Sequence, residues 1–106
     1  MQLFRHASLV HKLSNIDVNV AIDGEKIEID PLSTNKSIFG KIKNITIPIR
    51  DVKACKVKTT KSNMKKQIKI KYMEGDVKKS VIIESFAFDI EEMNKKINDS
   101  LESKPR

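Results

Sequence analysis

The side chains of this sequence that most often perform chemistry are two histidines and a single cysteine. His6 and His11 stand five residues apart, a spacing that places them on different faces of a helix or a strand. Cys55 lies on a predicted strand with Ala54 and Val57, and no histidine or helix N-terminus is expected beside it to activate the thiol. We therefore interpret the histidines as solvent-facing or lightly packed side chains and the cysteine as a small core residue.

Acidic residues occur in three close pairs that have structural explanations. Two pairs flank glycine turns, and the third begins a predicted helix, where carboxylates meet the positive end of the helix dipole. The pairs are Asp23 with Glu25, Glu74 with Asp76, and Glu91 with Glu92. With three glycines and one cysteine, the sequence has no Walker loop, glycine-rich cofactor loop or cysteine-built zinc site. The sequence therefore predicts a protein that is not an enzyme and that uses no metal or cofactor.

The strongest chemical feature is a basic segment in the second half of the chain. Between residues 50 and 79, eleven Lys or Arg stand against three acids, a net charge of +8, whereas the rest of the chain has a net charge of −1. Lysines alternate with apolar residues on two predicted strands, so we expect a stripe of lysines on one sheet face. The candidate anion-binding or partner-binding residues are Lys56, Lys58, Lys61, Lys65, Lys66, Lys69 and Lys71.

A lysine stripe has a structural explanation as well as a functional one. Exposed lysines keep a strand soluble and block edge-to-edge pairing, and an AT-rich genome raises lysine usage, which explains the stripe as well as binding does. If the stripe binds, its field attracts anionic lipid or nucleic acid. Nucleic-acid sites usually add Arg forks or exposed aromatic rings, whereas this segment has only Arg50 and an inward Tyr72. We therefore expect the stripe to bind a lipid surface or a protein partner in preference to nucleic acid.

The composition indicates one small domain that is rich in strands. A chain of 106 residues with 39% hydrophobic and 33% charged residues fits a single core. Four Phe, one Tyr and no Trp leave Ile and Val to fill that core, and β-branched side chains favour sheet. A single cysteine excludes an internal disulfide, and the apolar runs are too short for a signal peptide or a membrane span. We expect a cytoplasmic protein, peripheral to a membrane if its lysines bind lipid.

Alternating apolar residues predict six strands. Residues 16–22 and 27–31 alternate on either side of Asp23-Gly24, which is typical of a hairpin whose tight turn needs a positive φ. Pro48 marks the end of a third strand or an edge position, because it has no N–H for a ladder. The third to sixth strands are expected within 41–49, within 52–59 after an irregular start, at 67–72, and at 77–83 after a turn at Gly75.

The apolar period changes near residue 86. Large apolar residues then recur at spacings of four, three, four and four, which places them on one stripe of a helix: Phe86, Ile90, Met93, Ile97 and Leu101. Asp89 with Glu92 is typical of an N-cap pair, and Phe88 before that cap is expected to pack on Met93. The sequence predicts a helix from about Ile90 to Leu101, followed by a frayed end at 103–106.

The order of these elements resembles the bacterial pleckstrin-homology-like (PH-like) domains. The resemblance is carried by residues 39–52 with their Ile-Pro-Ile-Arg-Asp-Val step, by the hairpin of residues 68–81, and by the helix containing Met93-Asn-Lys-Lys-Ile97. It covers residues 16–102 and implies an antiparallel barrel or sandwich of about six to seven strands, capped by the C-terminal helix. Residues 1–15 fit neither a helix stripe nor strict alternation, so a short helix, a strand, or both remain open.

The resemblance also implies a role in binding. Phosphoinositide-binding members hold the headgroup with Lys and Arg near the loop that joins their first two strands. Here that loop is expected at residues 23–26, which are short and mostly acidic, so the headgroup site is not carried over. We expect a non-catalytic binding or scaffolding module that acts in protein–protein interaction or assembly, including self-association. The alternative is peripheral binding to anionic lipids through the basic hairpin; nucleic-acid binding is less favoured, and no small-molecule substrate is evident.

Overall fold

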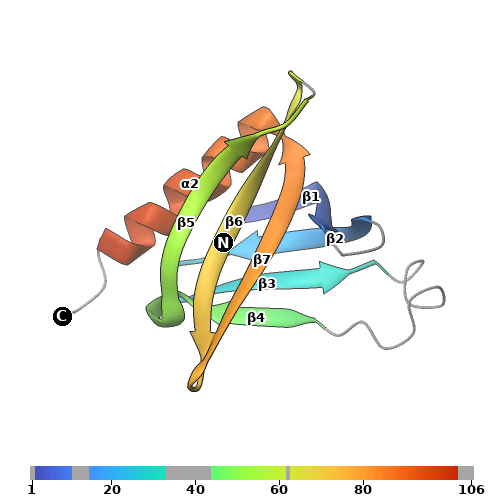
Figure 1. The fold of residues 1–106 in the computed structure, drawn as a ribbon. Helices are drawn as coiled ribbons and strands as arrows, with labels where there is room; N and C mark the ends of the chain where they lie inside the picture. The colour runs from blue at the N-terminus through green and yellow to red at the C-terminus, as the bar shows by residue number, and fades with distance from the viewer. Residues whose placement is uncertain (1, 11–14, 33–43, 62, 103–106) are drawn as a thin grey trace.

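The computed structural model describes residues 2–10, 15–32, 44–61 and 63–102, which form an antiparallel sheet covered at one end by a helix (Figure 1). The strand order across the sheet is β4-β3-β2-β1-β7-β6-β5. The predicted mainly β fold with one C-terminal helix is confirmed. In chain order the elements are β1 (Gln2–Val10), β2 (Asn15–Ile22), β3 (Lys26–Pro31), β4 (Ile45–Pro48), the 3₁₀ turn η1 (Ile49–Asp51), β5 (Val52–Thr59), β6 (Lys65–Glu74), β7 (Val77–Phe86) and α2 (Ala87–Glu102).

Strand β1 joins two halves of the sheet that cross at a steep angle. In Figure 1, β2, β3 and β4 run across the view, whereas β5, β6 and β7 run along its height with α2 beside them. β1 pairs with β2 along most of its length, and with β7 through Ser8 and Leu9. A register shift between Phe4 and Ala7 interrupts β1, and such a bulge bends a strand and increases its twist. One bent strand thereby serves both the β2–β4 half and the β5–β7 half.

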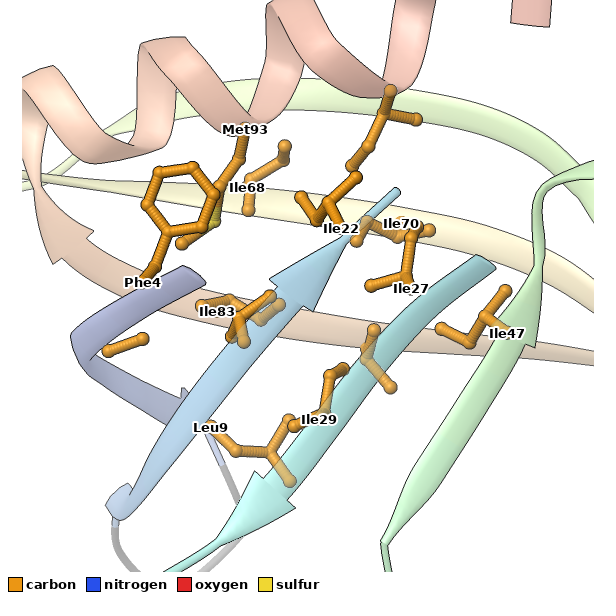
Figure 2. Packing of buried hydrophobic residues seen from close by; sticks show 14 of the residues in the cluster. Phe4, Leu9, Ile22, Ile27, Ile29, Ile47, Ile68, Ile70, Ile83 and Met93 are labelled. Carbon is orange, nitrogen blue, oxygen red and sulfur yellow. The ribbon is translucent and has the colours of Figure 1, made fainter. Parts of the chain in front are cut away.

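The core lies between the two halves and beneath α2. Ile and Val at alternating positions fill it, as the scarcity of aromatic residues predicted. Figure 2 shows isoleucines of both halves facing one another, with Phe4 of β1 beside Met93 of the helix. Burying each large aliphatic side chain contributes about 1.5–3 kcal/mol. The fully buried isoleucines are Ile16, Ile22, Ile27, Ile29, Ile47, Ile68, Ile70, Ile83, Ile90 and Ile97.

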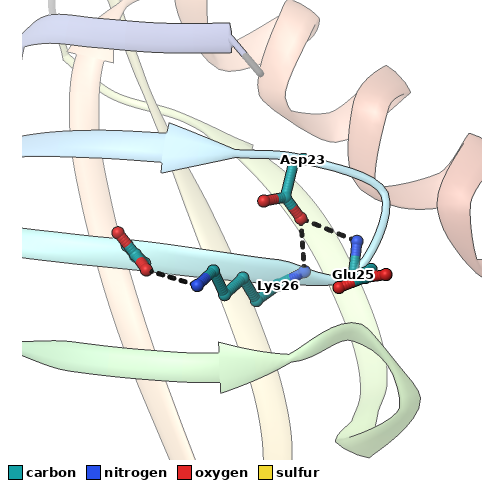
Figure 3. Close-up of polar contacts among 4 residues, drawn as sticks. Asp23, Glu25 and Lys26 are labelled. Carbon is teal, nitrogen blue, oxygen red and sulfur yellow. Dashed lines mark hydrogen bonds and ion pairs between the residues drawn. The ribbon is translucent and has the colours of Figure 1, made fainter.

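The β2–β3 hairpin forms where Asp23-Gly24 predicted it, but its turn is held differently. The Asp23 carboxylate accepts hydrogen bonds from the backbone N–H groups of Glu25 at 2.7 Å and Lys26 at 2.9 Å (Figure 3). These two bonds lower the pKa of Asp23. Among the described residues only Gly75 has a positive φ, 61°, so the prediction of a positive φ in this turn was wrong. The turn is closed by the Asp23 side chain, and it does not need a glycine in the left-handed conformation.

The first strand lies in the part of the sequence that was hardest to interpret. Residues 2–10 form β1, so the loop joining the first two strands is residues 11–14, which lie outside the described residues. The prediction that placed this loop at residues 23–26 was wrong, because those residues join β2 to β3. The acidic character of that turn therefore says nothing about a headgroup site at the β1–β2 loop.

The β5–β7 half begins as the sequence predicted. β4 ends at Pro48 and lies at the edge of the sheet, and η1 turns the chain into β5. The irregular start of the next strand is confirmed by a register shift between Val52 and Ala54. β7 continues three residues beyond the predicted end at Ile83, to Phe86. The expected strand residues 41–43 lie outside the described residues.

Helix α2 begins earlier than its cap signals indicated. It starts at Ala87, directly after β7, and the Ala87 N–H donates to the Met64 carbonyl oxygen at 2.9 Å. Ile90, Met93 and Ile97 are buried as the stripe predicted. Phe88 is 71% exposed, so the prediction that it packs on Met93 was wrong, as was the assignment of Asp89 as the cap, because Asp89 lies inside the first turn.

Phe86 was also misplaced on the helix stripe. It is the last residue of β7 and is 44% exposed. The helix packs chiefly on β5, β6 and β7, and it also contacts η1 and β2. Among the described residues, α2 falls short of the length and apolarity that a membrane-crossing helix needs.

Candidate interaction surface

Five of the seven candidate lysines share the outer face of the β5–β7 half. In the ladder Lys56 lies directly opposite Lys69, Val57 opposite Ile68, and Lys58 opposite Gln67. Ile68 and Ile70 are buried on the inner face, so the residues that alternate with them point outward. We call this surface the basic face; its lysines are Lys56, Lys58, Lys65, Lys69 and Lys71.

The other two candidates lie elsewhere. Lys66 alternates with the basic face and points toward the helix, where its Nζ lies 2.8 Å from Glu91 Oε1. Lys61 lies in the turn between β5 and β6 and is exposed. The sequence pattern therefore placed Lys66 in a cluster that the strand geometry divides. Successive side chains of a strand point to opposite faces of the sheet, so the neighbours Lys65 and Lys66 cannot share a face.

The lysines of the basic face repel one another. Lys56 and Lys69 are directly opposed across two strands, an arrangement in which like charges are destabilising. Within the described part of the chain, the ion pairs found join Lys26 to Glu28, Lys66 to Glu91 and Lys79 to Glu74, and none involves a lysine of the basic face. A binding partner that carries negative charge would relieve this repulsion.

A hollow of about 570 Å³ lies at the β6–β7 end of the same half. Tyr72 and Met73 contribute to its lining, and the Lys79 ammonium on its rim is 2.6 Å from Glu74 Oε2. That contact raises the pKa of Lys79, while burial raises the pKa of Tyr72. Tyr72 is only 8% exposed, as its inward position predicted. The lysines around the hollow are Lys53, Lys69, Lys71, Lys78 and Lys79.

Cys55 behaves as a packing residue in the structure. It is partly buried against the core, and its Sγ lies 3.4 Å from Asn94 Oδ1. Burial raises the pKa of this thiol to about 12, which keeps it protonated and a weak nucleophile at neutral pH. His11 and the His6 side chain lie outside the described residues, so the interpretation of the histidines stays a prediction.

Sequence reasoning missed a group of exposed apolar residues beside the basic face. Met64 is 70% exposed, Phe88 71% and Phe86 44%. The Ala87–Met64 backbone bond holds the β5–β6 turn against the start of α2, which brings these residues to one corner of the domain. We call Met64, Phe86 and Phe88 the apolar corner. Two features of the sequence could have indicated this exposure. Phe88 does not belong to the apolar stripe of the helix, and Phe86 does not belong to the inward-facing positions of β7.

The comparison with protein families matches this architecture over nearly the whole chain. The sequence model described as "SAPK-interacting protein 1 (Sin1), Pleckstrin-homology" matches residues 4–103. The chain belongs to the Sin1 pleckstrin-homology family. The Sin1 match includes β1 from Phe4 onward and extends through the whole of α2.

Two curated relatives support the same assignment. This Sin1-type domain is 34% identical over 101 residues to the target of rapamycin complex 2 subunit MAPKAP1 of Xenopus tropicalis, and 33% identical to the MAPKAP1 of Gallus gallus. Each match covers 92% of this chain and 19% of the relative, so the chain spans about a fifth of their length.

The relatives correct one part of the predicted resemblance. The pleckstrin-homology fold was recognised, but the bacterial branch of the family was wrong, because the matching proteins come from a frog and a chicken. The error arose because the segments used for the comparison consist of common strand residues. Such segments specify a strand order more strongly than they specify a branch of the family.

Proposed function

We propose that this Sin1-type domain is a non-catalytic interaction module that helps to assemble a larger protein complex. The observation that carries the proposal is the family match over residues 4–103, together with the relatives' description as subunits of target of rapamycin complex 2. The arrangement of the surface supports it, because charged and apolar side chains are gathered on the β5–β7 half, away from the core. An assembly module needs such a surface and no reacting group.

Affinity purification from the organism's own cells tests the proposal. We expect the tagged chain to recover other subunits of its target of rapamycin complex, identified by mass spectrometry. The Ile70→Asp variant places a charge in the fully buried core, so it should unfold the domain and lose those subunits. The exposed substitution Lys95→Glu on the helix serves as the control and should keep them. Recovery of the folded chain without any subunit of the complex would refute the proposal.

Peripheral binding to anionic lipid is a second candidate, and the lysine-lined hollow is the observation that favours it. Five lysines around one hollow concentrate positive potential where a negatively charged headgroup could bind. Such a module would work in the cytoplasm at the surface of a membrane. Sedimentation with vesicles that contain or lack phosphatidylserine, at low and high salt, tests this candidate. Absence of pelleting even at low salt would refute it.

A further inference from the structure

The apolar corner is the main concentration of exposed apolar side chains in the described residues. Five large apolar side chains are exposed among the described residues, and three of them, Met64, Phe86 and Phe88, form this corner. The position of these three is fixed by the backbone. Thr60 donates its hydroxyl to the Lys65 carbonyl oxygen at 2.9 Å across the β5–β6 turn, and Met64 accepts the N–H of Ala87. The corner is therefore held by the hydrogen bonds of Thr60 and Met64 and by the first turn of a helix.

The basic face begins at the apolar corner. Lys65 lies directly opposite Phe86 in the β6–β7 ladder, so a lysine and an aromatic ring stand side by side on the same face. From Lys65 the outward positions of β6 continue through Lys69 to Lys71, a distance of about 20 Å at the rise of a β-strand. An apolar anchor and a row of positive charges are thus parts of one continuous surface.

Negative charges interrupt this surface at a defined place. Glu84 lies opposite Gln67, and its Oε1 accepts a hydrogen bond from Gln67 Nε2 at 3.1 Å. The same row continues onto β1 and β2, where the Ser8 hydroxyl lies 3.5 Å from Asp17 Oδ1. A uniformly anionic membrane would be repelled by this acidic row, whereas a polypeptide can match it. Nucleic acid would be repelled in the same way, because its phosphate backbone carries a regular line of negative charge.

We propose that the apolar corner and the basic face together bind an acidic amphipathic segment of a protein partner. Apolar side chains of that segment cover Phe86, Phe88 and Met64, and its carboxylates follow the lysines of β5 and β6. Exposed aromatic anchors provide most of the affinity of such sites, while the lysines provide association rate and specificity. The inference rests on the proposed interaction role and goes further by naming the surface and the chemistry of the partner.

Selection from a phage-displayed library of random peptides on the 106-residue chain tests the inference. Enriched peptides should combine acidic with aromatic or aliphatic residues, and a synthetic copy of the strongest should bind the chain in solution. Phe88→Ser and the pair Lys56→Glu with Lys69→Glu should each weaken that peptide about tenfold or more, which corresponds to about 1.4 kcal/mol. Binding should also weaken as salt is raised.

Matched substitutions outside the surface provide the controls. Val77→Ser removes an apolar side chain that is 57% exposed at the β6–β7 turn, and Lys95→Glu reverses an exposed charge on α2. Both should leave the affinity within about twofold. Circular dichroism melts should show that all four proteins are folded, because none of the substituted side chains belongs to the core.

Several outcomes would overturn the inference. The first is a selection that does not enrich peptides with acidic and apolar residues. The second is a selected peptide whose affinity is unchanged by Phe88→Ser and by the lysine pair. The third is binding of phosphatidylserine vesicles or single-stranded DNA, in place of the peptide, through these residues. The proposed function is tested separately. If complex subunits still co-purify with the Phe88→Ser and lysine variants but not with Ile70→Asp, the assembly role stands and this surface is the wrong one.

Discussion

The two halves of the sheet share one core, but the charges on their outer faces are paired differently. In the β2–β4 half, Lys26 forms an ion pair with Glu28 at 2.9 Å on the same strand, and the Asp23 carboxylate accepts hydrogen bonds from backbone N–H groups. In the β5–β7 half, Lys56 opposes Lys69 in the ladder, and the described residues give neither an ion-pair partner. Both halves use the same Ile-rich inner face. The difference therefore lies in what each half leaves available for a partner.

The first way to break this comparison is to test whether the halves really share one core. Ile29→Ala in β3 and Ile70→Ala in β6 each remove a fully buried side chain. We expect each to lower the free energy of unfolding by about 2–5 kcal/mol. Urea denaturation followed by circular dichroism measures both. A second transition in either variant would show that the halves unfold separately.

The turns of the two halves should respond oppositely to the same substitution. Gly75 has a φ of 61°, so Gly75→Ala should cost about 1–2 kcal/mol. Gly24 has no positive φ and nothing within 4 Å of an added methyl group, so Gly24→Ala should gain about 0.4–1 kcal/mol by restricting the unfolded chain. Thermal melts of the two variants show whether each substitution raises or lowers stability. Equal losses would contradict the view that Asp23 rather than glycine closes the β2–β3 turn.

Neutralising one lysine in each half should also give opposite signs, with smaller effects. Lys69→Gln removes a like-charge opposition and should raise stability by about 0.2–1 kcal/mol at low salt. Lys26→Gln removes an exposed ion pair and should lower stability slightly. Both differences should shrink in high salt, because screening weakens exposed charge interactions. Salt-independent differences would indicate a packing effect instead of an electrostatic one.

The effect that is smallest at neutral pH concerns Cys55, which lies behind the basic face. Burial raises the pKa of its thiol from 9.0 to about 12. Alkylation by iodoacetamide at pH 8 should therefore be much slower in the native protein than in urea. Above pH 9 the thiol ionises in the unfolded chain but not in the folded one, so stability should fall as pH rises toward 12. Cys55→Ala should lack that part of the pH dependence, and equal alkylation rates would contradict it.

The sequence predicted those elements whose periodicity is set by one buried face. Alternation located the β2–β3 hairpin and the inward Tyr72, and the helix stripe located Ile90, Met93 and Ile97, because a solvent-facing side leaves a regular pattern. Strand β1 could not be predicted from the sequence, because its bulge interrupts the alternation of apolar residues and because the strand pairs with two different neighbours.

The candidate surface was predicted less completely than the fold. The lysine pattern identified five residues of the basic face, but it also included Lys66, which points to the helix side, and Lys61, which lies between β5 and β6. The apolar corner was missed because cap rules treat Phe88 as a local packing residue, whereas the actual helix start is fixed by a backbone bond to Met64, distant in sequence. Contacts of that kind depend on tertiary structure and leave no local signature.

The pairing of β1 with β7 has a consequence for the order of folding. Ser8 lies opposite Glu84, so the two ends of the chain must meet before the halves can join. Local hairpins such as β2–β3 can form early, but closure of the sheet waits for a contact of long sequence separation, which slows folding. During synthesis on the ribosome, the first strand would remain without its second neighbour until almost the whole domain had emerged.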